Sequence, residues 1–173
     1  MLKAAFPSGP PDATLPDPML FREGMSRVAG AVHIITTSGP AGKAGFTATA
    51  VTPVTDDPPS LLVCVNTSAR SPTALLENGV FAVNTLAADD RLLSEAFAGR
   101  IDLEGRDRFT VGDWQEALTG SPILASSLVS FACRIADARI VATHHVIIGE
   151  ILQIRLGEPR APLIYHGRRY HAL

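Results

Sequence analysis

Apolar residues along this chain fall into short runs that alternate with polar residues or are rich in β-branched side chains. Both patterns are typical of β-strands, where successive side chains point to opposite faces. The predicted strands are 32–37, 45–54, 61–65, 80–86, 128–141 and 146–156, with a last hairpin over 163–165 and 169–170. Pro53 is expected to end or bulge the second strand, because proline cannot donate a ladder hydrogen bond. Residues 142–145 join the two longest strands.

Helical spacing of apolar residues is brief and occurs in three places. Asp17 is a predicted N-cap with Pro18 at the first helical position, and this helix is expected to end near Gly30. The other predicted helices cover 71–76, which Asn78-Gly79 closes with a left-handed residue, and 89–97, which starts with acidic residues. Many strands and few helices predict a mainly β protein, an antiparallel barrel with short helical inserts.

Composition limits the size and the partners of the protein. A chain of 173 residues is expected to form a single domain over 17–173, after a flexible, proline-rich arm over 1–16. The net charge of −2 argues against nucleic acid or a membrane surface as the main partner. Hydrophobic residues make up 46% of the chain, which favours a surface buried against a second subunit. The N-terminus has no apolar secretory segment, so a cytoplasmic location is expected.

Cysteine and histidine show no spacing typical of a metal site. Cys64 and Cys133 each lie inside an apolar run and are expected to be small core residues rather than a disulfide. The histidines are scattered, and His33 in the first strand is expected to be an ordinary structural residue. We therefore predict no bound metal.

Small and hydroxyl residues dominate the second predicted strand, which reads GFTATAVTPV. Such residues over 47–49 let a planar ligand approach the strand backbone, where N–H and C=O groups can bind a ring that carries donors and acceptors. An ordinary strand whose threonines face water has the same pattern. This segment alone therefore leaves both interpretations open.

The segment NTSARS follows the third strand and adds groups that favour an anion. Ser71 is a predicted N-cap, and the free N–H groups at the start of its helix attract negative charge. Ser68 and Arg70 would supply a hydroxyl donor and a cation, although a capped helix beside an exposed arginine is also common. Together with the small-residue strand, this segment leads to the hypothesis of a ring with a phosphate tail.

Several ordered motifs extend that hypothesis along nearly the whole chain. They are GFTATAV, LLVCVN followed by SxRSPT, GVFAVNTL, LSEAFAG and HxxxxGE. In this order and spacing the sequence resembles the flavin reductase family, the short FMN-binding split-barrel reductases of two-component monooxygenases. The resemblance implies a homodimer of six-stranded antiparallel split barrels of Greek-key type, with the flavin near the subunit interface. It also implies hydride transfer from NADH or NADPH to FMN or FAD, and delivery of reduced flavin to a separate monooxygenase.

The resemblance also assigns roles to individual residues. It implies that the isoalloxazine ring lies on Thr47, Ala48 and Thr49, the ribityl chain near Asn66, the phosphate at Ser68, Arg70 and Ser71, and that Ser94, Phe97, Ala98 and Gly99 close over the flavin. Where the family often has Gly-Asp-His near the nicotinamide, this chain has Ala142-Thr143-His144. His144 is therefore the candidate catalytic residue, and the choice between NADH and NADPH stays open.

Two other functions fit the same motifs. In one, FMN is a prosthetic group and another acceptor is reduced. In the other, the domain binds FMN without catalysis.

Overall fold

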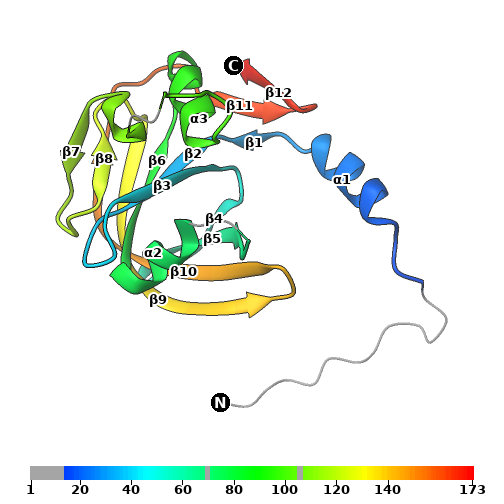
Figure 1. Cartoon of the computed structure of the whole chain (residues 1–173), viewed down its shortest axis with the longest axis horizontal. Coiled ribbons are helices and arrows are strands. Elements are labelled where there is room, and N and C mark those ends of the chain that lie inside the picture. The colour runs from blue at the N-terminus through cyan, green and yellow to red at the C-terminus, as the bar shows by residue number, and fades with distance from the viewer. Residues whose placement is uncertain (1–13, 69–70, 105–106) are drawn as a thin grey trace.

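The computed structural model describes residues 14–68, 71–104 and 107–173. Its largest sheet has seven antiparallel strands in the order β3-β2-β6-β9-β10-β5-β4 (Figure 1). The strands are β2 (His33–Thr37), β3 (Ala44–Ala48), β4 (Val51–Asp56), β5 (Pro59–Asn66), β6 (Val80–Thr85), β9 (Val129–Val141) and β10 (His144–Leu156). Two smaller sheets contain β1 (Gly30–Ala31), β11 (Leu163–His166) and β12 (Arg169–Ala172), and β7 (Trp114–Glu116) and β8 (Pro122–Leu124). The predicted mainly β, antiparallel class is confirmed.

The two edge strands of the seven-stranded sheet, β3 and β4, are consecutive in the chain. Only Thr49 and Ala50 separate them, yet β3 pairs with β2 and β4 pairs with β5. The sheet therefore curls until its two edges meet at one bend, which is the split of the barrel. Prediction of a single strand over 45–54 was wrong, because the chain changes partners at this bend. The expected irregularity at Pro53 is confirmed by a register shift between Pro53 and Thr55.

Apolar side chains fill both faces of the curled sheet. One cluster inside the barrel includes Ile35, Val63, Phe81, Val83 and Ile147, all fully buried. A second cluster lies between the outer face of β2 and the helix α3 (Arg91–Phe97), and it includes Ile34, Leu93, Phe97 and Leu124. Strand β3 is thus packed on both sides, with Phe46 and Ala48 toward the barrel and Gly45 against the Phe97 ring.

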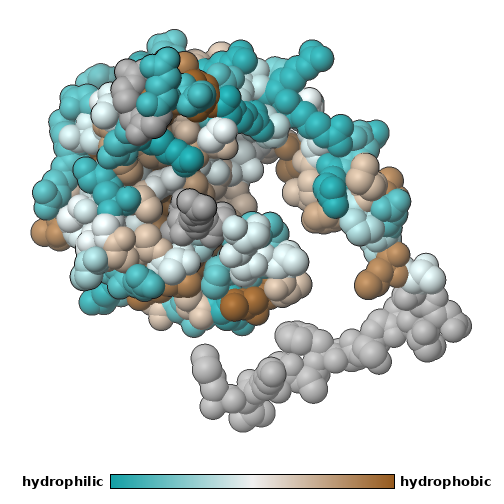
Figure 2. Space-filling view, viewed as in Figure 1, coloured by the Kyte–Doolittle hydropathy of each residue, from teal (hydrophilic) through white to brown (hydrophobic). Residues whose placement is uncertain are grey.

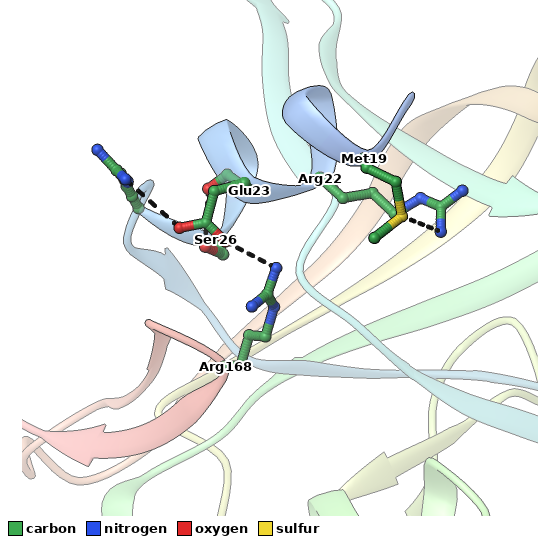
Figure 3. Close-up of polar contacts among 6 residues, drawn as sticks. Met19, Arg22, Glu23, Ser26 and Arg168 are labelled. Atoms are coloured by element: carbon green, nitrogen blue, oxygen red, sulfur yellow. Dashed lines mark hydrogen bonds and ion pairs between the residues drawn. The ribbon is translucent and has the colours of Figure 1, made fainter. Parts of the chain in front are cut away.

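Helix α1 (Pro18–Ser26) stands apart from the barrel. The Asp17 side chain accepts a hydrogen bond from the Met19 amide at 2.8 Å, which confirms the predicted N-cap. The helix ends before Gly30, contrary to prediction, because Gly30 pairs with β11 instead. Figure 2 shows open space between this helix and the body of the molecule. An ion pair of 2.9 Å between Glu23 and Arg168 ties the helix to the last hairpin (Figure 3).

Other predicted elements agree with the structure except at their ends. Helix α2 spans Ser71–Asn78, and Gly79 follows with φ of 69°, as expected for a left-handed cap. The predicted helix 89–97 is a 3-10 turn, η1 (Ala88–Asp90), followed by α3. A second 3-10 turn, η2 (Arg108–Thr110), precedes the hairpin β7–β8, which the sequence did not predict. The turn between β9 and β10 contains only residues 142 and 143, so His144 belongs to β10.

Most of the predicted N-terminal arm, residues 1–13, lies outside the described residues. Within the described part, no helix has the length and apolar character that crossing a bilayer needs. Cys64 and Cys133 are free thiols, and only Cys133 is fully buried in the core.

Candidate functional site

Three hollows meet at the bend between β3 and β4. The Asn66 groove, about 360 Å³, runs between residues 46–50, 64–66, Phe97 and Ala98. The Arg100 groove, about 180 Å³, lies beside it and is lined by Val32, 47–49, Ala98, Arg100, Tyr165 and Tyr170. The α1 cavity, about 620 Å³, lies between α1 and the barrel and includes His33, Thr49, Ala50, Tyr165 and Arg168. Thr49 lines all three, so the hollows form one connected region.

Small side chains form the walls of the Asn66 groove. Ala48, Ala50 and Ala98 leave the backbone of β3 and the end of α3 accessible. The Thr49 hydroxyl makes no hydrogen bond within the described residues, so it is available to a ligand. Both features fit a flat ring that contacts a strand backbone, and they fit the donor and acceptor pattern expected of residues 47–49.

The Thr47 hydroxyl has a different environment from that of Thr49. It donates a hydrogen bond of 2.7 Å to the backbone carbonyl of Ser94 in α3. The Ser94 hydroxyl in turn donates to the Tyr170 hydroxyl at 2.9 Å, and Ser94 is completely buried. Thr47, Ser94 and Tyr170 therefore connect β3, α3 and β12 through hydrogen bonds. Ser94 lines none of the three hollows.

Asn66 ends β5 and shapes the loop that follows. Its side-chain oxygen accepts hydrogen bonds from the Ser68 amide at 2.9 Å and the Ser68 hydroxyl at 2.8 Å. The N-terminal end of α2, which follows this turn in the sequence, is the predicted phosphate site. To donate to a phosphate, the Ser68 hydroxyl would have to rotate away from Asn66. Arg70 lies outside the described residues, and Ser71 is described only as the first residue of α2.

The residues expected to close over the flavin occupy different positions. Phe97 lines the Asn66 groove but is only 1% exposed, and its ring packs edge-on against Phe109 at 5.1 Å. Ala98 is exposed and lines both the Asn66 and the Arg100 grooves. Gly99, with φ of 70°, ends α3 and lines none of the three hollows. The structure thus brings together Phe97, Ala98 and residues 47–49, and Gly99 does not line the groove.

Aromatic and cationic groups line the Arg100 groove. The Tyr165 and Tyr170 rings meet edge-on at 5.3 Å, and the Arg100 guanidinium lies 5.8 Å from both ring centres. Hydrogen bonding to Tyr165, with the nearby Tyr170 oxygen, raises the pKa of Arg100 above its ordinary value. The sequence left the role of the charged loop 100–108 open between covering the nucleotide and facing solvent, and it did not indicate Tyr165, because only the folded chain brings Arg100 and Tyr165 together.

The two histidines near the site differ in environment. His144 is exposed at the start of β10, directly opposite Asn66 in the register, and does not line the three hollows. His33 lies opposite Ala48, and its Nδ1 is 3.1 Å from the Thr85 hydroxyl. Burial lowers the pKa of His33 to about 4, so this imidazole is neutral near pH 7. His33 also lines the α1 cavity, which the sequence did not indicate.

The family model of the flavin reductase like domain matches residues 25–173. The chain belongs to the flavin reductase-like family. A curated relative from Ancylobacter novellus, "FMN reductase (NADH) RutF", is 48% identical over 153 residues, which cover 88% of this chain and 83% of that protein. The resemblance noted in the sequence is thereby confirmed.

Solved structures of the flavin reductase-like family have the same fold. BorF, the flavin reductase component of a bacterial two-component tryptophan halogenase, matches with a TM-score of 0.83 and 30% identity, over 91% of this chain and 98% of that chain. The Streptomyces globisporus NADH:FAD oxidoreductase SgcE6, in complex with NAD and FAD fragments, matches with a TM-score of 0.82 and 26% identity, over 92% and 96%. The split barrel is therefore shared with flavin reductases of two-component systems.

Proposed function

We propose that this chain is an NADH:flavin oxidoreductase that transfers a hydride from NADH to FMN and supplies the reduced flavin to a separate enzyme. The observation that carries the proposal is the Asn66 groove, which this member of the flavin reductase-like family lines with small residues and a threonine hydroxyl that makes no hydrogen bond within the described residues. FAD and NADPH remain alternative substrates in this proposal.

Flavin supplies the chemistry, since it accepts a hydride at N5 and later passes the electrons on. The chain's own residues would bind the flavin and orient it. The backbone at Ala48 and the Thr49 hydroxyl would hold the ring, Asn66 would lie beside the ribityl chain, and Ser68 with Arg70 and Ser71 would bind the phosphate. Alignment of two rings at contact distance is the main contribution such a site makes to the rate.

The test is a steady-state assay of NADH and NADPH oxidation with added FMN or FAD. A flavin substrate should accelerate oxidation in proportion to its occupancy and should exchange freely on dilution. Flavin that stays bound through dilution, with no rate gain from added flavin, would instead support a prosthetic group and another acceptor. A flavin-bound protein that oxidises neither nucleotide would support the binding module and contradict the reductase.

The phosphate site is tested by comparing FMN with riboflavin, which lacks the phosphate. Arg70→Gln together with Ser71→Ala should weaken FMN binding by about 10-fold or more and leave riboflavin binding almost unchanged, because charge-assisted hydrogen bonds to phosphate are lost. Dissociation constants from flavin fluorescence quenching give the comparison. Equal losses for the two ligands would place the phosphate elsewhere.

His144 remains the candidate for contact with the nicotinamide, as the motif predicts. His144→Gln should then raise the KM for NADH and leave the dissociation constant of FMN unchanged. The neighbouring His145→Gln is the matched control, since its side chain lies on the opposite face of β10. Equal effects of the two substitutions on KM would remove His144 from the site.

We also propose a homodimer and a cytoplasmic location. Helix α1 buries none of its side chains within the described residues, and Met19, Leu20, Phe21 and Met25 are each at least half exposed. A short amphipathic helix needs tertiary packing for stability, and a second copy would provide it. Sedimentation equilibrium should give twice the monomer mass, and Phe21→Asp should shift the protein toward monomer. The two free thiols fit a reducing compartment.

The enzyme that receives the reduced flavin is proposed to be a monooxygenase. BorF, which has the same fold, is a component of a two-component system whose partner is a halogenase, so a separate acceptor enzyme is the arrangement this proposal adopts. Reduced flavin made by this protein should support product formation by an added flavin-dependent monooxygenase when the two proteins are kept apart by a dialysis membrane.

A further inference from the structure

The Arg100 groove adjoins the Asn66 groove along β3. The two share residues 47–49 and Ala98. A hydride donor must come within about 3–3.5 Å of the acceptor atom, so its binding site must touch the site of the flavin ring. A fourth hollow, lined by Ser38, Lys43 and residues of β7, shares no lining residue with the Asn66 groove. The Arg100 groove therefore has the position that a second ligand requires.

Cations line both the Arg100 groove and the α1 cavity, where Arg22 also forms no ion pair within the described residues; the contact of Arg100 with two tyrosine rings distinguishes its groove. Arg100 is exposed and forms no ion pair within residues 14–68, 71–104 and 107–173. Arg168 in the α1 cavity is neutralised by Glu23 at 2.9 Å. Arg91 lies over the same Tyr170 ring at 5.6 Å, but it pairs with Glu95 at 3.1 Å. Arg100 is thus an exposed cation that has no ion-pair partner among the described residues lining its groove.

Arg100 is also held in place before any ligand arrives. Its guanidinium lies over two tyrosine rings, and one of them, Tyr170, is fixed by the Ser94 hydroxyl. Thr47 binds the backbone of the same α3 residue, so a continuous set of contacts links Arg100 to the strand that faces the flavin groove. A preorganised cation loses little side-chain entropy on binding an anion.

Resting on the proposed reductase function, we propose that the Arg100 groove binds the phosphate-bearing part of the hydride donor, and that Arg100 is the residue that recognises its phosphates. The tyrosine rings give that part of the dinucleotide an apolar surface, while the guanidinium presents paired N–H donors to phosphate oxygens. Arg100 acts here in ligand binding and takes no part in the transfer of the hydride.

The test measures binding without turnover. The probe is 1,4,5,6-tetrahydro-NAD, which keeps both phosphates of NADH but cannot donate a hydride, titrated calorimetrically into the FMN-loaded protein. Arg100→Gln should weaken probe binding about 10- to 100-fold, as expected for the loss of hydrogen bonds to a charged group. Arg91→Gln, the matched control on the same tyrosine, should change it by less than about twofold. Arg100→Lys keeps the charge and should bind better than Arg100→Gln.

The dissociation constant of FMN is measured for the same variants and should stay within about twofold of the unmodified protein. Unchanged probe binding by Arg100→Gln would overturn the proposal. Equal losses of probe and FMN would also overturn it, because Arg100 would then serve the flavin or the fold. Failure of the unmodified protein to oxidise NADH with any flavin would contradict the reductase function and is a separate result, since probe binding needs no reaction.

Discussion

Acid should destabilise this protein through His33 in a way that one substitution can isolate. His33 lies on β2 between β3 and β6, and partial burial of its side chain lowers its pKa from 6.5 to about 4. Between these two values the unfolded chain binds a proton at His33 and the folded protein does not. Protonation therefore favours the unfolded state, so the His33 contribution is fully present above pH 6.5 and is lost as the pH falls toward 4.

The size of the effect follows from the two pKa values. From pH 7 to pH 5, this single group should lower the free energy of unfolding by about 2 kcal/mol. His33→Gln keeps a polar side chain beside the Thr85 hydroxyl and carries no charge at either pH. Its loss of stability between pH 7 and pH 5 should therefore be smaller than that of the unmodified protein by about 2 kcal/mol.

Urea denaturation followed by circular dichroism at both pH values measures these free energies. Carboxyl groups that titrate in the same range are present in both proteins, so they cancel in the comparison. His171→Gln is the matched control, because His171 is an exposed histidine on β12. An equal loss of stability in His33→Gln and the unmodified protein would show that His33 is protonated in the fold, and the burial argument would be wrong.

Two further pairs of substitutions test the packing around the site by denaturant unfolding. Gly149→Ala should lower the free energy of unfolding by about 1–3 kcal/mol, because the added methyl would lie 2.4 Å from the Phe81 ring. In Gly24→Ala, the control in α1, the added methyl meets nothing within 4 Å, so this substitution should stabilise the protein slightly. Equal effects of the two substitutions would contradict the packing argument. Thr47→Val should cost about 1 kcal/mol, since it removes a 2.7 Å hydrogen bond to a carbonyl of α3. Thr49→Val should leave stability nearly unchanged and weaken FMN binding. A larger loss of stability in Thr49→Val than in Thr47→Val would contradict the roles proposed for the two threonines.

Local patterns predicted the elements that depend on neighbouring residues. The Asp17 cap, the left-handed Gly79 and the last hairpin are as expected, because each is decided within a few residues. The small and hydroxyl residues of the segment 47–49 suggested a ligand but fitted an ordinary strand equally well, so they did not identify the flavin. The motif order along the chain then identified the family.

Contacts between distant segments decided the rest. The bend at residues 49–50 exists because β3 and β4 join opposite edges of one curled sheet, and nothing in the local sequence distinguishes that bend from a continuous strand. The pairing of β2 with β3 places His33 opposite Ala48, and the pairing of β10 with β5 places His144 opposite Asn66. Arg100 meets Tyr165 and Tyr170 only after β11 and β12 fold back.

The sequence by itself therefore determined the β class and the family, and it singled out the segment proposed to hold the flavin. The tertiary structure decided which groups surround that segment. The physical reason is that strand and cap preferences act over a few residues, whereas burial, the pKa of His33 and the position of Arg100 depend on packing between segments more than 50 residues apart in the chain.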